Sequence, residues 1–532
     1  MAATAFPGRL PVLLTGTLAL TVIAGLMAAL AQPPWGFLPG LLGFGVLMRQ
    51  IDRLGSPWRW RGAFGLGWLA GVGYFVPSLI WLAQPFQVDA EAQGWMAPFA
   101  VALMAMAMAL FWGAAALAYR LLARRGPSRV LLFAAAFALC EWLRGHVFTG
   151  LPWDLPGESW RAGSAPSQAA ALVGAYGLTW LTLAAAAAPF TAFEGRSGRV
   201  VALGGVGLVA GLYAFGAARL AEAIPNDLHA PHVRIVQADV EQESKYDRRI
   251  FTSIVGRYVA LTGRAPMGGR PADIVVWPEG AIPAALDDYL GRGAWTRDLI
   301  AGALRPGQTL ILGGYRYGTE ANGTPITYNS LAALRAEADG PTVVGLYDKF
   351  RLVPFGEFMP FDSVATRWGI KQFVHVGDGF TSGPPPRPLK IAGLPAVQPL
   401  ICYESLFPGF TREGGEASGV RAAWIANISN DAWFGKGVGP RQHLNLASYR
   451  AIEEGLPMIR ATPTGVSAII DAYGRIVPGK SLGLGAYGVI DGILPPALAP
   501  TLFNRLGDTP FLVMLIVSLS GAAVPGRVKR RA

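Results

Sequence analysis

Charge and cysteine are both scarce in this chain. Only 15% of its 532 residues are Asp, Glu, Lys or Arg, whereas soluble proteins carry about 25%. Hydrophobic residues make up 52%, so the composition excludes a disordered chain and argues against an entirely soluble enzyme. The two cysteines, Cys140 and Cys402, offer no disulfide framework.

Several cofactor and metal motifs are also missing. The sequence contains no P-loop, no G-x-G-x-x-G after a strand and no H-E-x-x-H. Its five histidines include no close pair at metal-ligand spacing. We therefore expect no cofactor and no metal site, and any chemistry must come from ordinary side chains.

Long apolar runs dominate the N-terminal part of the chain. A helix that crosses a bilayer needs about 20 mostly apolar residues, because the bilayer core offers no water to its backbone. We predict a helical membrane domain at residues 1–221 with about seven spans, and a further span with a basic tail at residues 495–532. The apolar runs lie at residues 10–31, 35–48, 63–82, 96–118, 130–142, 169–190, 200–215 and 510–524.

The basic residues predict how these spans cross the membrane. Arginine clusters lie in every second loop, and the loop with Arg144 and Arg161 is a partial exception. Positively charged loops stay in the cytoplasm. We therefore expect a multi-pass protein of the bacterial inner (cytoplasmic) membrane with both termini cytoplasmic and the segment after the seventh span in the periplasm. The net charge of +11 then reflects membrane topology, and no nucleic-acid partner is expected.

Two tryptophans, Trp153 and Trp160, lie in an outer loop at residues 144–167. Tryptophan is enriched at the level of the lipid headgroups. The loop is therefore interpreted either as an interfacial anchor or as part of a lipid-binding mouth, in which Trp153 would contact substrate.

A polar domain is expected at residues 222–494. Short runs rich in Val and Ile, such as residues 232–237 and 273–277, alternate there with helix-like stretches such as residues 248–262 and 295–304. Strands that alternate with helices predict an α/β layered domain.

Three places in this domain combine a strand end or a turn with a reactive side chain. Glu279 follows the run DIVVW and a proline, and Lys349 lies just before an apolar turn. Cys402 ends the run AVQPLIC. A thiolate nucleophile needs a base to take its proton and a cation to hold the developing oxyanion. Cys402 could be the nucleophile, Glu279 the base and Lys349 the cation. The other thiol, Cys140, would lie inside an apolar span, where a thiolate is disfavoured.

The order and surroundings of these residues resemble known families. Glu279, Lys349 and Cys402 resemble the Glu-Lys-Cys triad of the nitrilase, or carbon–nitrogen hydrolase, superfamily. The strings VPFGEFMPF after Lys349, ICYE around Cys402 and SNDAWFG at residues 429–435 are similar to apolipoprotein N-acyltransferases. EWLRG at residues 141–145 and GLPW at residues 150–153 extend this likeness to the membrane part.

The resemblance implies a fold and further site residues. The polar domain would be a nitrilase-like α-β-β-α sandwich joined to a multi-span α-helical membrane domain. Glu279 would match the family's base, Lys349 its oxyanion-stabilising lysine and Cys402 its nucleophile. Further residues that match the family's site are Glu357, Tyr403, Glu404 and Asn329.

The sequence departs from the family pattern at two places. Tyr246 stands where relatives often have a tryptophan in a flexible arm, and Thr-Pro-Thr-Gly at residues 462–465 replaces a common Asn-Asn-Gly. Both departures concern contacts of the lid. We expect apolar arms to line a mouth that opens to lipid, and ordinary core packing is the alternative interpretation of the same cluster. The expected lining residues are Phe355, Phe358, Met359 and Phe361.

The resemblance also implies acyl transfer between two lipid substrates. The sn-1 chain of a phospholipid, with phosphatidylethanolamine expected, would form a thioester on Cys402. It would then pass to the α-amine of the diacylglyceryl-cysteine that begins an apolipoprotein. Two rival functions stay open. A membrane-anchored amidase or nitrile hydrolase would deliver the acyl group to water, and a transporter or binding protein would do no chemistry. Few charges lie within the spans, which counts against a transporter.

Overall fold

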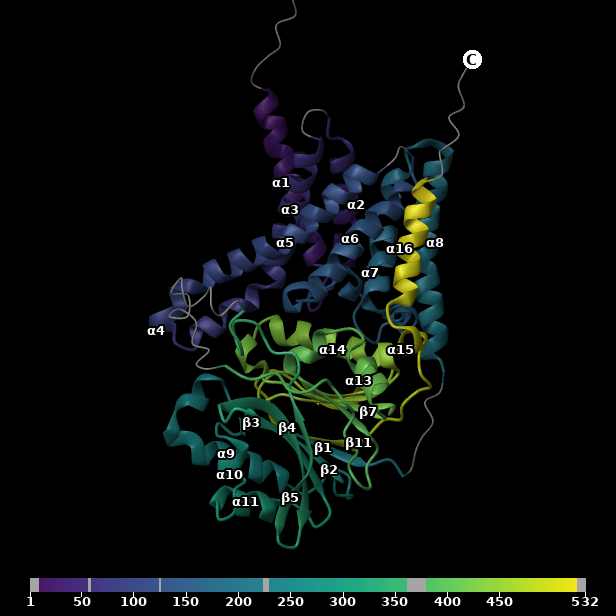
Figure 1. Ribbon diagram of the computed structural model, residues 1–532. Helices are drawn as coiled ribbons and strands as arrows, with labels where there is room; N and C mark the ends of the chain where they lie inside the picture. Colours follow the sequence, from purple (N-terminus) through teal and green to yellow (C-terminus); the bar gives the residue numbers. More distant parts are fainter. Residues whose placement is uncertain (1–8, 56–58, 124–125, 223–228, 361–378, 524–532) are drawn as a thin grey trace, which may run out of the picture. The chain divides into compact units, whose positions relative to one another are not determined.

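The computed structural model describes residues 9–55, 59–123, 126–222, 229–360 and 379–523. The chain divides into two compact units (Figure 1). Unit 1 comprises Met1–Ala221 and Leu506–Ala532, and unit 2 comprises Glu222–Arg505. The second boundary therefore lies after residue 505, not after residue 494 as expected.

The physical reason for this shift lies in backbone contacts of residues 495–505 with unit 2. The Leu498 N–H donates to the Gly455 carbonyl at 2.9 Å, and the Thr501 hydroxyl donates to the carbonyl of Glu453. These bonds join the segment to the end of a helix in unit 2, so it does not belong to the last apolar helix.

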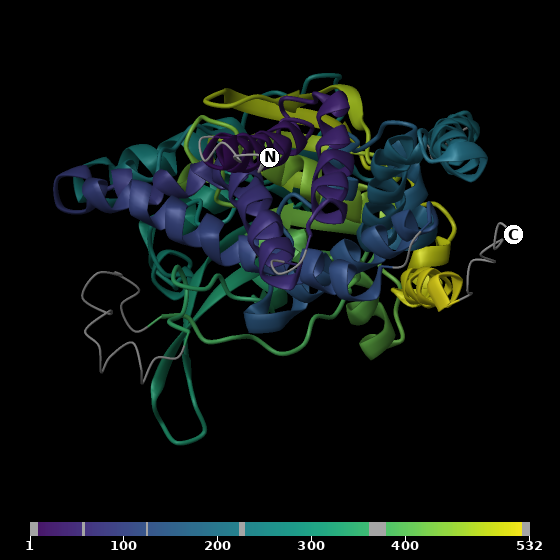
Figure 2. The ribbon, with the colours of Figure 1, turned by 90° about the horizontal axis from the view of Figure 1, so that it is seen from above.

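Unit 1 is built from helices, and its elements follow the apolar runs of the sequence. The α-helices are α1 (Arg9–Ala29), α2 (Leu42–Asp52), α3 (Arg59–Ser78), α4 (Ala90–Gln93), α5 (Ala97–Leu122), α6 (Arg129–His146), α7 (Ala170–Ala187), α8 (Gly195–Leu220) and α16 (Thr509–Ala523). The C-terminal α16, drawn in yellow, packs against α6 and α7 (Figures 1 and 2).

Several of these helices have the length and composition of a membrane span. In the described part of the chain, four stretches are long and apolar enough, namely Ala90–Leu122, Arg129–Thr149, Pro166–Thr191 and Gly195–Leu220. A bent pair, Arg59–Ser78 and Ile80–Gln87, would make a fifth. Parts of two further helices are also apolar, namely Gly16–Ala29 within the 21-residue α1 and Thr509–Ser520 within the 15-residue α16.

The second expected span, at residues 35–48, is wrong. A 3₁₀ turn at Leu38–Leu41 leads there into α2, which has only 11 residues. Gly36 takes a left-handed φ of 65° and Pro39 lies in the turn. A proline lacks the N–H that a continuous helix needs and the glycine conformation breaks the helical path, so no single helix fills this run.

The EWLRG string forms a buried charged cluster inside unit 1. Arg144 forms an ion pair with Glu141, and the Trp112 indole N–H donates to Glu141 at 2.5 Å. Arg144 also donates to the Leu151 carbonyl in the following loop. In that loop Trp153 is only 2% exposed and its ring lies 4.5 Å from that of Trp81. Trp153 thus packs within unit 1, and the role of its loop as an interfacial anchor or a lipid-binding mouth stays a prediction.

Unit 2 contains two mixed sheets. The strand order is β11-β1-β2-β3-β4-β5 in the six-stranded sheet and β10-β9-β8-β7-β6 in the five-stranded sheet. β1, β2 and β3 run parallel, as do β6, β7 and β8. The strands are β1 (His232–Ala238), β2 (Ile274–Val276), β3 (Thr309–Thr319), β4 (Pro325–Glu337), β5 (Gly340–Asp348), β6 (Val397–Ile401), β7 (Trp424–Ile428), β8 (Met458–Ala461), β9 (Ser467–Ile470), β10 (Ile476–Leu482) and β11 (Tyr487–Ile493).

Helices cover the outer faces of the two sheets (Figure 1). One core joins the six-stranded sheet to α9 (Phe251–Thr262) and α11 (Trp295–Ala303) through residues such as Tyr258, Trp277 and Ile300. A second core lies between the sheets and includes Ile235, Ile401 and others such as Ile428. The remaining helices of the unit are α10 (Leu286–Tyr289), α13 (Phe410–Ser418), α14 (Gly439–Glu454) and α15 (Leu502–Leu506), the last of which ends at the unit boundary.

This arrangement confirms the α-β-β-α sandwich. The inner faces of both sheets are apolar and bury each other, while each outer face buries the apolar side of a helix layer. Buried parallel strands carry few polar side chains along their length, so reactive groups are concentrated just past the strand ends.

Candidate active site

The expected reactive residues lie at strand ends of both sheets. Glu279 comes just after β2. The Trp277 N–H donates to the Ile311 carbonyl and the Gly313 N–H donates to the Pro278 carbonyl, so the pairing with β3 continues past the end of β2. Lys349 comes directly after β5, and its N–H donates to the Asn329 carbonyl on β4 at 2.8 Å. Cys402 directly follows β6 of the other sheet. Because β2, β3 and β5 point the same way, Glu279 and Lys349 meet at one edge of the six-stranded sheet.

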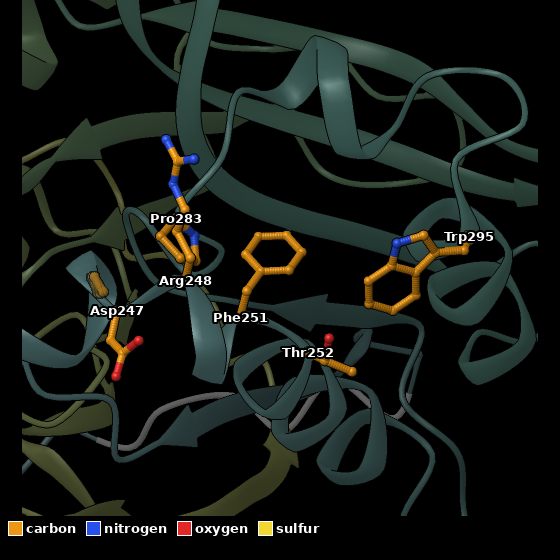
Figure 3. Close-up of a pocket in the computed structure, with 7 residues that line it drawn as sticks. Asp247, Arg248, Phe251, Thr252, Pro283 and Trp295 are labelled. Atoms are coloured by element: carbon orange, nitrogen blue, oxygen red, sulfur yellow. The ribbon is translucent and has the colours of Figure 1, made fainter.

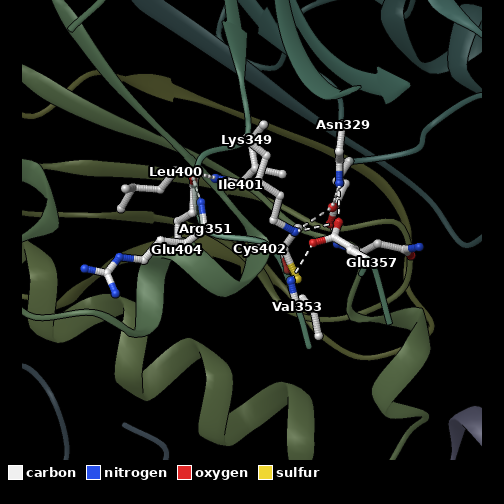
Figure 4. Close-up of polar contacts among 12 residues, drawn as sticks. Asn329, Lys349, Arg351, Val353, Glu357, Leu400, Ile401, Cys402 and Glu404 are labelled. Atoms are coloured by element: carbon white, nitrogen blue, oxygen red, sulfur yellow. Dashed lines mark hydrogen bonds and ion pairs between the residues drawn. The ribbon is translucent and has the colours of Figure 1, made fainter. Parts of the chain in front are cut away.

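Glu279, Asn329, Lys349 and Glu357 form one buried polar cluster (Figure 4). The Lys349 ammonium lies 2.9 Å from Glu357 Oε1 and 3.5 Å from Glu279 Oε1. The Asn329 amide donates to both of these oxygens at 2.7 Å. The Asn430 N–H donates to Glu279 Oε2 at 2.7 Å. Each carboxylate is therefore held in place by charge-assisted hydrogen bonds.

Cys402 occupies a sharp turn at the end of β6. Its φ of 49° lies in the left-handed region, which is rare for a residue with a Cβ. The Ser405 hydroxyl donates to the Cys402 carbonyl at 2.8 Å. A strained backbone of this kind persists only where its surroundings hold it. The turn directs the cysteine side chain away from the strand, toward the polar cluster (Figure 4).

Glu404 joins the Cys402 turn to the segment that follows Lys349. Its Oε2 accepts from the Ile401 N–H at 2.8 Å. Its Oε1 accepts from the Tyr347 hydroxyl at 2.7 Å and from the Phe350 N–H at 2.8 Å. Burial raises the pKa of Glu404 to about 7, although these donors act in the opposite direction. One side chain thus fixes the spacing between the ends of β5 and β6.

A second buried network lies behind the cysteine. The Ser429 hydroxyl donates to Asp431 at 2.7 Å. Asp431 pairs with Arg460 at 2.8 Å and with His443 at 2.9 Å. His443 reaches the Cys402 carbonyl at 3.3 Å. The backbone of the turn is therefore tied to one charged centre.

The electrostatics of the cluster favour a neutral thiol beside a charged lysine. Burial and the neighbouring Glu279 raise the pKa of Cys402, while Lys349 acts in the opposite direction. Burial alone would lower the pKa of Lys349, but the charges of Glu357 and Glu279 outweigh it and the pKa is raised. The resting site therefore holds an ammonium ion and a protonated sulfur, so the thiol needs a base before it can attack.

The charges of the second network are set in the same way. Burial acts to raise the pKa of Asp431, yet Arg460 and His443 outweigh it and the pKa is lowered. Burial and Arg460 lower the pKa of His443. Asp431 therefore stays anionic and keeps the Ser429 hydroxyl as a donor.

The remaining expected residues are placed differently. Tyr403 lies next to the nucleophile turn, and its ring meets that of Phe407 edge-on at 5.1 Å. Tyr246 is 64% exposed and Phe355 is 48% exposed, as accessible arms would be. Met359 is buried, with only 9% of its surface exposed. Phe358 is partly buried, and Phe361 lies outside the described residues. Contact of any of them with lipid stays a prediction, as it does for Trp153.

Sequence reasoning missed several residues of this site. Ser429, Asn430 and Asp431 belong to the SNDAWFG string, which marked the segment but assigned no role to a side chain. Arg460 and His443 gave no local signal, because they come from β8 and α14 and meet Asp431 only in the folded chain. Within the described ranges, no group of three or more His, Cys, Asp or Glu side chains is arranged to hold a metal ion.

Comparisons with known proteins agree with this architecture. The family model "Apolipoprotein N-acyltransferase N-terminal domain" matches residues 24–188, and the "Carbon-nitrogen hydrolase" model matches residues 232–493. A protein of Caulobacter vibrioides named apolipoprotein N-acyltransferase is 54% identical over 500 residues, which cover 94% of this chain and 93% of its own. A protein of the same name from Bradyrhizobium diazoefficiens is 38% identical over 524 residues, 96% of this chain and 95% of its own.

Among solved structures, an amidase from Nesterenkonia sp. aligns at 17% identity and a TM-score of 0.35, over 52% of this chain and 93% of its own. Unit 1 has helices that are long and apolar enough to cross a membrane, and both relatives are similar over nearly the whole chain. We conclude that the chain is a membrane protein. Since both family models match in order and the relatives are similar over nearly the whole length, the chain belongs to the apolipoprotein N-acyltransferase family.

Proposed function

We propose that the chain transfers the sn-1 acyl chain of a phospholipid to the α-amine of the diacylglyceryl-cysteine at the N-terminus of an apolipoprotein, through a thioester on Cys402. The observation that carries this proposal is the position of Cys402. Its sulfur lies at a strained turn that faces a carboxylate, Glu279, and an ammonium ion, Lys349, in one buried cluster.

Acylation of Cys402 is the first half of the reaction. Glu279 takes the thiol proton as the sulfur attacks the ester carbonyl, because the resting thiol is protonated and needs a base. Lys349 and a backbone N–H beside Cys402 stabilise the oxyanion that forms. When the carbon–oxygen bond breaks, protonated Glu279 returns its proton to the alkoxide of the lysophospholipid, and the acyl group stays on sulfur.

Aminolysis of the thioester is the second half. Glu279 removes a proton from the free amine of the lipoprotein as its nitrogen attacks the thioester carbonyl. The oxyanion is held again by Lys349, the carbon–sulfur bond breaks and an amide forms. Glu357 and Asn329 keep Lys349 and Glu279 at fixed distances throughout, because both side chains bond to the groups that move protons or charge.

The membrane helices supply a reason for this chemistry to take place at a bilayer. Each methylene group exposed to water costs about 0.8 kcal/mol, so withdrawing a whole acyl chain into water would dominate the barrier. A site fed directly from the bilayer avoids that cost. We accordingly propose a multi-pass protein of the bacterial inner membrane with its catalytic domain in the periplasm and its termini in the cytoplasm. Residues 222–494 would form the core of that domain.

Mass spectrometry of the full-length protein after incubation with phospholipid tests the proposal. We expect an acyl adduct on Cys402 and its transfer to a diacylglyceryl lipopeptide. Cys402→Ala should abolish both, whereas Cys140→Ala, which removes the other buried thiol, should leave both unchanged. Release of free fatty acid without N-acylated lipopeptide would instead identify a hydrolase. N-acylation by the Cys402→Ala variant would refute the thioester.

A further inference from the structure

Unit 2 contains a pocket of about 450 Å³ (Figure 3). Its walls come from the segment before α9, the first turn of α9, the segment after Glu279 and the start of α11. The charged lining residues are Lys245, Asp247 and Arg248, and the rings of Phe251 and Trp295 form an apolar wall. Pro283 and Thr252 complete the lining.

The pocket is linked to the base of the reaction through Lys245. The Lys245 ammonium donates to Asn430 Oδ1 at 3.2 Å, and the N–H of the same asparagine donates to Glu279 Oε2 at 2.7 Å. A Cβ on Gly280, the residue after Glu279, would lie 3.5 Å from the Lys245 nitrogen. Lys245, one of the lining residues, therefore contacts the residue that holds the Glu279 carboxylate and lies beside the residue that follows it.

The lining is arranged for an anion. Lys245 and Arg248 both carry positive charge, and Arg248 forms no ion pair with any residue that the structure describes. The one acid, Asp247, is already neutralised by Arg249 at 2.8 Å, which does not line the pocket. The first turn of α9 adds the positive end of a helix dipole. Burial lowers the pKa of Lys245 to about 8, and a bound anion would favour its charged form.

We propose that this pocket binds the phosphate of the glycerophospholipid acyl donor, a proposal that rests on the function argued above. In such a lipid the phosphodiester lies only a few bonds from the sn-1 ester. An ester carbonyl at Cys402 therefore brings the phosphate close to Glu279 and into reach of Lys245 and Arg248. Arginine forms paired hydrogen bonds with phosphate oxygens, and the apolar wall accommodates the carbon atoms beside the phosphate.

The two half-reactions differ in their use of this pocket. The acyl donor and the lysophospholipid that leaves both carry the phosphate, whereas the amine of the lipoprotein carries none. Changes at Arg248 should therefore affect acylation of Cys402 and leave aminolysis of a preformed thioester unaffected. A purely structural role of Arg248 would disturb both steps.

The rate of acyl-enzyme formation in the full-length protein tests the proposal. Because a hydrogen bond to a charged group is lost, Arg248→Ala should raise the phospholipid concentration for half-maximal acylation about tenfold or more. With diacylglycerol of the same chains as donor, which lacks the phosphate, the variant should match the wild type. Arg292→Ala removes an exposed arginine near α11 that does not line the pocket, and this control should behave as wild type with both donors.

A binding experiment separates failure of this inference from failure of the proposed function. The soluble headgroup glycerophosphoethanolamine should bind the wild type in calorimetric titration and bind Arg248→Ala about tenfold more weakly. Such binding in a protein that never acylates Cys402 would support the pocket and refute the proposed function. Equal effects of Arg248→Ala and Arg292→Ala, or equal loss with diacylglycerol, would overturn the phosphate site.

Discussion

Replacement of Glu279 by glutamine should separate the rate of acyl transfer through Cys402 from the ease with which the Cys402 thiol ionises. Glu279 acts on the thiol in two ways in the proposed mechanism. As a base it removes the proton during catalysis, and as a neighbouring negative charge it raises the pKa of the thiol. Glu279→Gln removes both effects with little change in volume. Acyl transfer should then fall, while the thiol itself becomes easier to ionise.

The two effects have estimable sizes. Loss of a general base lowers a rate by about 10²–10⁴-fold. The new amide also places a nitrogen beside Asn329 or the Asn430 N–H, which now donate to the carboxylate at 2.7 Å, and one of these hydrogen bonds is lost. In the opposite direction, a single neighbouring like charge shifts a pKa by about one unit or more. Each unit changes the thiolate fraction about tenfold. Lys349 stays charged, because Glu357 still lies 2.9 Å away.

Alkylation by iodoacetamide measures the thiolate directly. With full-length protein at pH 7–9, we expect Cys402 of the Glu279→Gln variant to react about tenfold faster than that of the wild type at equal pH. Acyl-enzyme formation from phospholipid in the same preparation should fall about 100-fold or more. Cys140, which is buried in α6, serves as the internal reference for access of the reagent. Slower alkylation of Cys402 in the variant would refute the assignment of Glu279 as the charge that keeps the thiol neutral.

Three further perturbations follow from the buried contacts. Arg460→Met leaves the carboxylate of Asp431 buried without its cation and should lower the free energy of unfolding by about 3–5 kcal/mol. As a control, Arg412→Met breaks a partly exposed ion pair and should lower the free energy of unfolding by about 1 kcal/mol or less. Thermal unfolding monitored by tryptophan fluorescence compares the two variants. The pKa of Glu404 rises from 4.5 to about 7 on folding, so ionisation of Glu404 destabilises the fold as pH rises through that interval. Glu404→Gln should therefore flatten the fall in Tm between pH 5 and 7. An unchanged slope of Tm against pH would contradict this role of Glu404. Phe355→Asp should retain the wild-type Tm, because the Phe355 ring is 48% exposed. The variant should turn over long-chain phospholipid more slowly relative to a short-chain donor. An equal loss with both donors would argue against a lining role of Phe355.

The class of the fold could be predicted because its causes are local. Apolar runs of bilayer length in residues 97–122 and 195–220 form helices regardless of their neighbours, and alternation of Val-rich runs with helical stretches favours layered sheets. The run at residues 35–48 shows where this reasoning fails. Its composition is apolar, but Pro39 and Gly36 divide it, and the length of a helix depends on such interruptions more than on mean hydropathy.

The reactive residues could be found for a different reason. Glu279 and Cys402 come after the buried strands β2 and β6, and Lys349 follows β5, which is only partly buried. Their combination, order and flanking strings, rather than any one of the residues, made them recognisable in a single sequence. Arg460 and His443 escaped notice because each looks ordinary alone. Arg460 lies within the short strand β8 and His443 lies in a helix. Their importance comes from Asp431, which contacts both although it is 29 residues from Arg460 and 12 residues from His443 in the sequence.

Cys402, the proposed nucleophile, is held by contacts that also stabilise the fold, and this limits how the site can vary. The left-handed φ of Cys402 is unfavourable by itself. The turn persists because Glu404 bonds it to the segment after β5 and because Ser405 and His443 bond its carbonyl. Loss of any of these bonds would let the turn relax and move the sulfur away from Glu279. A substitution there should therefore reduce the rate of acylation before it unfolds the chain, since a small displacement of a reacting atom costs more in rate than in stability.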